Sequence, residues 1–130
     1  MKKKKILITG GAGYLGSILT TKLVYLGYDV TVIDILEFNK ISLSHLFLKK
    51  NFKFINGDVR NKKLMSKELK NNDIIIPLAA LVGAPLCAKY PKKTLDINYK
   101  CIKFILSKLK LSQKIIYPNT NSGYGIGDKN

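Results

Sequence analysis

The sequence predicts an α/β fold, in which helices cover both faces of a doubly wound parallel sheet of five strands. Three observations carry this prediction. Short, continuously apolar segments alternate along the chain with longer segments whose apolar residues recur every three or four positions. The short segments are apolar throughout, which is typical of parallel strands that are buried on both faces. The chain has 130 residues, a length that suits one such domain, so we interpret residues 1–130 as a single domain.

Three strands and two helices are predicted in the first half of the chain. The strands are expected over residues 4–9, 29–34 and 52–56. A helix over 13–26 is indicated by apolar residues at helical spacing, which are Leu15, Ile18, Leu19, Leu23 and Leu26. Gly27 follows this helix, where a C-cap belongs. A short helix is expected over residues 42–49.

The second half of the chain continues the alternation. We expect a polar helix over 61–70, a strand over 73–76, a long amphipathic helix over 91–110 and a fifth strand over 114–117. Right-handed crossovers then give the strand order 3-2-1-4-5, with the fifth strand at an incomplete edge of the sheet. Ligands of such sheets bind at the carboxyl ends of the strands, beside the switch point between strands one and four.

The chain is strongly basic, with 23 Lys and Arg against 8 Asp and Glu and a net charge of +15. A basic face can bind nucleic acid through the phosphate backbone. However, Arg60 is the only arginine, and the lysines are spread along the chain rather than gathered on one helix. We therefore expect a solvated lysine surface and no specific nucleic-acid binding.

Other features of the composition predict a cytoplasmic domain. No apolar segment approaches the ~18 residues of a membrane span, and the first ten residues lack the apolar region of a secretory signal. We therefore expect no membrane contact. Cys87 and Cys101 make neither a disulfide framework nor a metal site.

A glycine-rich segment follows the first strand and opens the first helix. It satisfies the pattern G-x-G-x-x-G through Gly11, Gly13 and Gly16. Without Cβ atoms, such a backbone can turn tightly and approach a pyrophosphate, whose charge the helix N-terminal amides stabilise. A purely structural turn is the alternative. We expect cofactor contacts from the whole segment, which comprises Gly10, Gly11, Ala12, Gly13, Tyr14, Leu15 and Gly16.

Asp34 ends the second strand, 23 residues after Gly11. A dinucleotide site expects an acidic residue at about this distance, where it accepts hydrogen bonds from the adenosine ribose. A carboxylate there would repel a 2′-phosphate, and Ile35 and Leu36 follow rather than an arginine. The sequence therefore favours NAD over NADP.

With these two motifs, the chain resembles the N-terminal portion of an extended short-chain dehydrogenase/reductase of the nucleotide-sugar epimerase and dehydratase family. Three later segments resemble the family as well, namely residues 57–60, 78–80 and 96–98. The resemblance covers essentially all 130 residues and implies a Rossmann fold. It implies that Asp58 binds the adenine amino group and that Val59 packs on the ring. It also implies cofactor contacts from Leu78, Ala79, Ala80 and Asn98.

The same resemblance implies a substrate site after the fifth strand. Aligning on Tyr124-Gly125 places Thr120 at the position of the family's catalytic Ser/Thr, with Ser122 as the fallback. A hydroxyl there can hydrogen-bond the sugar oxygen as its charge changes. A simple turn is the alternative for a loop this rich in Asn, Ser and Gly. We expect the sugar to be bordered by Ser122 and, after the fourth strand, by Gly83, Ala84 and Pro85.

Two features depart from the family pattern. The first is Pro77, which stands where most relatives have His. The second is the general base, which in the family is a Tyr in Y-x-x-x-K downstream of the Ser/Thr segment and has no counterpart there in this sequence. The spacing of Tyr99 and Lys103 matches that pattern, but both precede the fifth strand, and we interpret them as helix surface. The chain ends at Asn130, before the expected position of the pair and of the substrate lobe.

The resemblance implies an NAD-dependent epimerase or dehydratase, which acts on a nucleotide-diphosphate sugar through a transient keto sugar in cell-surface polysaccharide synthesis. We expect this chain to be the cofactor-binding half of such an enzyme and to be inactive alone. A homodimer is one expected form of the intact enzyme. A stand-alone NAD-binding module or partner subunit is the alternative function. A lysine-rich nucleic-acid binder, whose affinity would fall steeply with salt, is a third, without a motif in its support.

Overall fold

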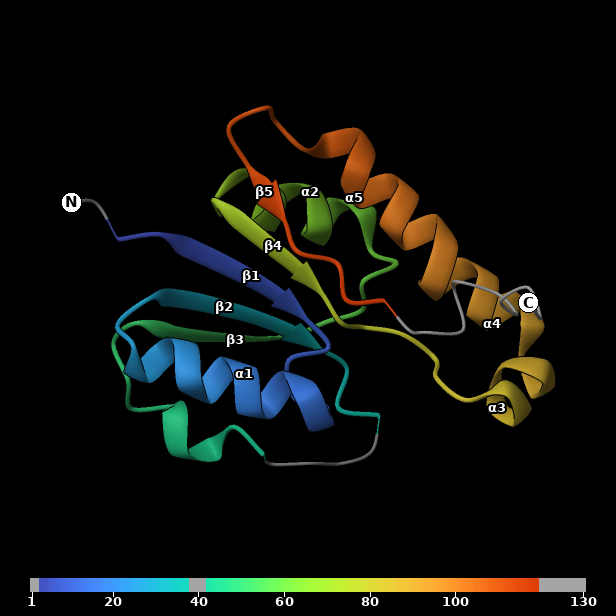
Figure 1. Cartoon of the computed structure of the whole chain (residues 1–130), viewed down its shortest axis with the longest axis horizontal. Coiled ribbons are helices and arrows are strands. Elements are labelled where there is room, and N and C mark those ends of the chain that lie inside the picture. The colour runs from blue at the N-terminus through green and yellow to red at the C-terminus, as the bar shows by residue number, and fades with distance from the viewer. Residues whose placement is uncertain (1–2, 38–41, 120–130) are drawn as a thin grey trace, which may run out of the picture.

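The computed structural model describes residues 3–37 and 42–119, and these build a five-stranded parallel sheet (Figure 1). The strand order is β3-β2-β1-β4-β5, as the sequence predicts. The strands are β1 (Lys5–Thr9), β2 (Asp29–Asp34), β3 (Phe52–Asn56), β4 (Ile74–Pro77) and β5 (Lys114–Ile115). Among the described residues, β5 is an edge strand that pairs with β4.

Helices cover both faces of the sheet (Figure 1). Helix α1 and the 3₁₀ turn η1 lie on one face, and α2, the π-helical segment η2 and α5 lie on the other. The helical elements are α1 (Tyr14–Tyr25), η1 (Ser44–Leu46), α2 (Lys62–Lys70), α3 (Ala84–Lys89), α4 (Pro91–Thr94), η2 (Leu95–Cys101) and α5 (Ile102–Lys108). No helix within the described ranges is both long and apolar enough to cross a membrane.

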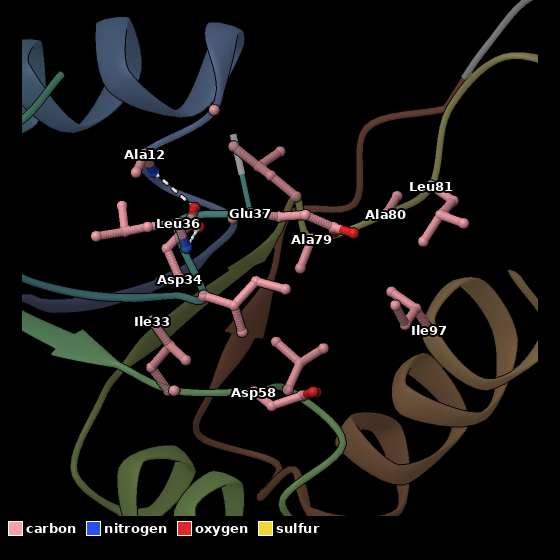
Figure 2. Close-up of a pocket in the computed structure, with 16 residues that line it drawn as sticks. Ala12, Ile33, Asp34, Leu36, Glu37, Asp58, Ala79, Ala80, Leu81 and Ile97 are labelled. Atoms are coloured by element: carbon pink, nitrogen blue, oxygen red, sulfur yellow. Dashed lines mark hydrogen bonds between the residues drawn. The ribbon is translucent and has the colours of Figure 1, made fainter. Parts of the chain in front are cut away.

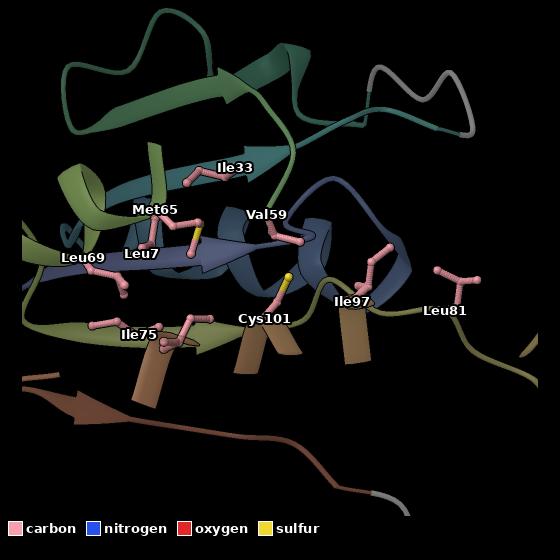
Figure 3. Packing of buried hydrophobic residues seen from close by; sticks show 10 residues of the cluster. Leu7, Ile33, Val59, Met65, Leu69, Ile75, Leu81, Ile97 and Cys101 are labelled. Atoms are coloured by element: carbon pink, nitrogen blue, oxygen red, sulfur yellow. The ribbon is translucent and has the colours of Figure 1, made fainter. Parts of the chain in front are cut away.

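The central strands β1, β2 and β4 are largely apolar because successive side chains enter two different cores. The outer strand β3 carries Lys53 and has no fully buried residue. In β1, Leu7 is buried with α2, η2 and α5, whereas Ile6 and Ile8 are buried on the α1 side. Figure 3 shows the first of these cores, in which Leu7, Ile33 and Ile75 from three neighbouring strands meet helix residues such as Met65, Leu69 and Cys101.

Helix α1 buries only part of the face that its apolar spacing predicts, because Leu19 and Leu23 pack against the core but are not fully buried. Its buried residues are Gly16, Thr20 and Val24, whereas Leu15 and Ile18 are more than half exposed. The reason is steric: a Cβ at Gly16 would lie 2.3 Å from the Gly10 carbonyl oxygen, so the helix turns Gly16 toward the loop that precedes it. The apolar spacing therefore predicts the helix correctly but not the rotation about its axis.

Helix α1 ends where the sequence predicts, in a Schellman motif. Gly27 has a φ of +87°. Its N–H donates to the Val24 carbonyl, and the Tyr28 N–H donates to the Leu23 carbonyl, at 3.0 and 3.1 Å. The positive φ is the conformation that favours glycine at this position.

Three helical segments differ from the sequence prediction. The short helix predicted over 42–49 is a 3₁₀ turn at Ser44–Leu46. The long helix predicted over 91–110 runs from Pro91 to Lys108 in three parts, because the π-helical segment η2 separates α4 from α5. Helical spacing does not distinguish a π turn from an α turn. Helix α3 is not predicted at all, since none of its residues is buried and it therefore carries no apolar periodicity.

Thr20 provides a test of the packing beneath α1. Its side chain is fully buried, and its hydroxyl finds no hydrogen-bond partner among the described residues. An unpaired buried hydroxyl is unfavourable, so Thr20→Val, which keeps the shape, should raise the free energy of unfolding by about 1 kcal/mol in urea denaturation.

Thr21→Val is the matched control. The Thr21 hydroxyl donates to the Ser17 carbonyl at 2.7 Å and lies 3.0 Å from His45 Nε2. This variant should therefore be no more stable than the wild type. A Thr20→Val variant that gains no stability over Thr21→Val would contradict the packing described here.

Candidate cofactor-binding site

A cavity of about 150 Å³ lies at the carboxyl ends of the strands, where the strand order predicts a ligand site (Figure 2). Loops after four strands form it: Gly10, Ala12 and Gly13 after β1, residues 35–37 after β2, residues 57–59 after β3, and residues 78–81 after β4. Asp34, at the end of β2, also lines it. None of the described lining residues is Lys or Arg, although the chain carries a charge of +15.

Backbone hydrogen bonds hold these loops in register with the sheet. Gly10 N–H donates to the Ile33 carbonyl at 2.8 Å, Gly57 N–H to the Asp34 carbonyl at 3.0 Å, and Leu78 N–H to the Thr9 carbonyl at 2.8 Å. The parallel ladder thus continues past the strand ends. The loops therefore begin from defined positions at the cavity.

The glycines of the first loop have different roles. Gly10 has a φ of +71°, and a Cβ on it would lie 2.6 Å from the Ala79 backbone nitrogen, so only glycine lets the loops after β1 and β4 meet. A Cβ at Gly13 would meet only the Gly10 carbonyl, at 3.3 Å. Gly13 therefore leaves its side of the loop open toward the cavity that it lines.

The first turn of α1 is suited to an anion. Gly13 is the N-cap, no side chain caps this end within the described chain, and the first turn carries no acidic residue. The leading N–H groups of a helix have no partner inside the helix, and the helix dipole adds partial positive charge there. A helix N-terminus of this kind favours an anionic group, such as a pyrophosphate.

Asp34 connects the loop after β1 with the turn after β2 (Figure 2). Its Oδ2 accepts the Ala12 N–H at 2.9 Å, and its Oδ1 accepts the Leu36 N–H at 2.8 Å. Ser42 Oγ donates to the Ala12 carbonyl at 2.8 Å, so the loop is held from both sides. A carboxylate has about four acceptor positions, and Asp34 therefore retains capacity for the hydroxyls of a ribose.

Asp58 forms a close ion pair with Arg60. Arg60 Nε lies 3.0 Å from both carboxylate oxygens, and Nη2 lies 2.5 Å from Oδ2. The guanidinium hydrogen bonds hold the pKa of Asp58 below its usual value, against the effect of partial burial. The carboxylate is therefore charged at neutral pH, and it lines the cavity beside Val59.

The Asn98 amide is used by the backbone of Leu81. Its Oδ1 accepts the Leu81 N–H at 2.9 Å, and its Nδ2 donates to the Leu81 carbonyl at 2.8 Å. Asn98 is not among the lining residues, whereas Leu81 and Ile97 are. Its visible role is to anchor the loop after β4 on η2.

The structure brings most of the sequence-predicted cofactor residues together. The predicted residues that line the cavity are Gly10, Ala12, Gly13, Asp34, Asp58, Val59, Leu78, Ala79 and Ala80. The other predicted residues of the described chain, which do not line it, are Gly11, Tyr14, Leu15, Gly16, Gly83, Ala84, Pro85 and Asn98. Thr120 and Ser122 lie outside the described residues.

Several lining residues are absent from the sequence prediction, namely Ile33, Ile35, Leu36, Glu37, Gly57, Leu81 and Ile97. Most of them are sequence neighbours of a predicted motif at a strand end, and this position is the signal that could have identified them. Ile97 carried no such signal, because it comes from the helix that packs beside the cavity. Tyr99 and Lys103 are exposed and do not line the cavity, which confirms that they belong to the helix surface.

Known proteins resemble this chain along nearly its whole length. It is 33% identical over 126 residues to a UDP-N-acetyl-alpha-D-glucosaminuronate decarboxylase from Bacillus cytotoxicus, covering 96% of the chain and 39% of that protein. It is 34% identical over 125 residues to UDP-glucuronic acid decarboxylase 1 from Danio rerio, covering 95% of the chain and 29% of that protein. The chain thus spans well under half the length of these relatives.

A solved structure agrees with the fold. The UDP-glucose 4-epimerase of Thermotoga maritima, crystallised with UDP-glucose, superposes with a TM-score of 0.81 at 27% identity, over 96% of this chain and 41% of that one. The sequence model of a protein family described as the NAD dependent epimerase/dehydratase family matches residues 6–130. The chain belongs to the NAD dependent epimerase/dehydratase family.

Proposed function

We propose that this chain binds NAD as the cofactor part of an enzyme that converts a nucleotide sugar. The cofactor of the family is NAD. The observation that carries the proposal is the placement of Asp34, whose carboxylate holds the loop before α1 and lines the same cavity as Gly13 at the helix N-terminus. The proposed anion site and the proposed ribose acceptor line the same cavity, as a dinucleotide requires.

In this proposal, different residues of the cavity bind different parts of the cofactor. The first turn of α1 holds the pyrophosphate, Asp34 accepts the adenosine ribose hydroxyls, and Asp58 accepts the adenine amino group while Val59 packs on the ring. Asp34, Glu37 and Asp58 are all carboxylates on the cavity wall, and they disfavour the additional phosphate of NADP. When bound, NAD supplies a reversible hydride acceptor.

The substrate proposal rests on the relatives and on the resemblance. The relatives named above are UDP-sugar decarboxylases, and the structural neighbour is a UDP-glucose epimerase. We propose that Thr120 hydrogen-bonds a sugar hydroxyl, with Ser122 as the fallback, and that Gly83, Ala84 and Pro85 border the sugar. No Tyr or His is found among the described lining residues. We therefore expect the 130-residue chain to bind NAD without turnover.

Asp34→Ala tests the cofactor site. Loss of a charged hydrogen-bond acceptor for the ribose should raise the Kd for NADH, measured by its fluorescence, by about 10- to 100-fold. Asp29→Ala is the matched control, because Asp29 begins the same strand at the opposite end, and NADH should bind to it as to the wild type. Equal Kd values for the two variants, or a folded wild-type chain that binds no NADH, would contradict the proposed function.

Gly13→Ala and Gly16→Ala separate binding from packing. A Cβ at Gly13 meets one atom at 3.3 Å, whereas a Cβ at Gly16 would lie 2.3 Å from the Gly10 carbonyl oxygen. Gly13→Ala should therefore weaken NADH binding, with a loss of unfolding free energy under about 1 kcal/mol. Gly16→Ala should lose about 1–3 kcal/mol or more in urea denaturation. The reverse ranking of stabilities would contradict the assigned roles.

A further inference from the structure

An ion pair joins two sides of the cofactor cavity. Glu37 lines the cavity after β2, and Lys93 lies in α4, after the loop that follows β4. The Lys93 ammonium donates to Glu37 Oε1. Figure 2 shows the Glu37 side chain extending from the β2 side toward Ala79 and Ala80. The pair thus links the turn after β2, which lines the cavity, to a helix that lies outside the cavity lining.

A strained turn directs Glu37 across the cavity. Leu36, the residue before it, has a φ of +54°, a left-handed conformation that costs a residue with a Cβ roughly 1–3 kcal/mol. The Asp34 carboxylate holds this turn by accepting the Leu36 N–H at 2.8 Å. The position of Glu37 therefore depends on the residue that also holds the glycine loop.

Lys93 places positive charge close to two of the three carboxylates that line the otherwise apolar cavity, Glu37 and Asp58. Arg60 is the main cause of the low pKa of Asp58, and the Lys93 ammonium adds to the same effect. Lys93 therefore acts on acidic groups from both the β2 side and the β3 side of the cavity. Its side chain is 30% exposed, so the ion pair lies at the boundary between the cavity and solvent.

Helix α4, which carries Lys93, and the preceding helix α3, all of whose residues the structure describes, contribute no fully buried residue, although Cys87 of α3 packs against the core. The following segment η2, by contrast, contributes Ile97 and Cys101 to the core. Segments with few buried contacts open at low free-energy cost. A contact between α4 and Glu37 can therefore form and break while the core stays intact.

We propose that Glu37 and Lys93 form a strap across the cofactor cavity, which a dinucleotide must part in order to enter or leave. The inference rests on the proposed binding of NAD and names two residues that set its exchange rate. Removal of the strap lowers the same barrier in both directions. Binding and release therefore accelerate together, and the Kd stays nearly unchanged in the double variant, which keeps the net charge beside the cavity. A direct contact with the cofactor would behave differently, because its loss would raise the release rate and the Kd.

The test is stopped-flow fluorescence of NADH binding and release with Glu37→Gln, Lys93→Met and the double variant. An exposed ion pair accounts for about a two- to five-fold change, so each single variant should raise both rates by that factor. The double variant should be no faster than the single variants. Exchanging the charges, with Glu37→Lys and Lys93→Glu together, should restore slow exchange. Lys92→Met is the matched control, because Lys92 is an exposed neighbour in the same helix.

Hydrogen exchange supplies a readout that needs no cofactor. Amides of residues 84–94 should exchange faster in Lys93→Met than in Lys92→Met. Three outcomes would contradict the proposed strap. The first is equal hydrogen exchange in the two variants, and the second is additive effects of the single variants on the rates. The third is a rise in Kd that comes from faster release alone. A wild-type chain that binds no NADH contradicts the proposed function. A wild-type chain that binds NADH at rates unaffected by either substitution contradicts only the strap.

Discussion

The close approach of α1 to the loop after β1 is the constraint on which the site depends. A Cβ at Gly16 would lie 2.3 Å from the Gly10 carbonyl oxygen, and a Cβ at Gly10 would lie 2.6 Å from the Ala79 nitrogen. These two contacts bring the start of α1, the end of β1 and the loop after β4 together. They also turn Thr20 into the core and leave Ile18 more than half exposed. The helix thus gives up part of its apolar burial, and its N-terminus reaches the cavity.

Asp34 extends this arrangement to the other side of the cavity. Its two oxygens hold Ala12 in the glycine loop and Leu36 in the following turn, and that turn directs Glu37 toward Lys93. One carboxylate therefore organises the loop, the turn and the ion pair across the cavity. If Asp34 also accepts the ribose hydroxyls as proposed, one residue couples the shape of the site to its chemistry.

The charge of the chain and the charge of the site have opposite signs. The chain carries +15, yet the charged residues that line the cavity within the described segments are Asp34, Glu37 and Asp58. Lys93 and Arg60 pair with two of these carboxylates. Among the described residues, the backbone amides at the start of α1, rather than lysine side chains, are the groups that suit the proposed pyrophosphate. The lysines of the described segments lie outside the cavity lining.

The sequence alone determined the sheet, its strand order and much of the cavity, because continuous apolar segments, a strand-to-helix glycine motif and an acid at the end of β2 are local patterns. It did not determine the rotation of α1, the π-helical turn around Asn98 or the existence of α3. The first two depend on tertiary contacts, such as the close approach of Gly16 to the Gly10 carbonyl and the hydrogen bonds of the Asn98 side chain to the Leu81 backbone. The pairing of Glu37 with Lys93 was likewise decided by tertiary structure, since 56 residues separate them and neither belongs to a motif. The periodicity of apolar residues indicates which face of a strand or helix can be buried. The close contacts of its backbone with other segments determine which face is buried in the folded protein.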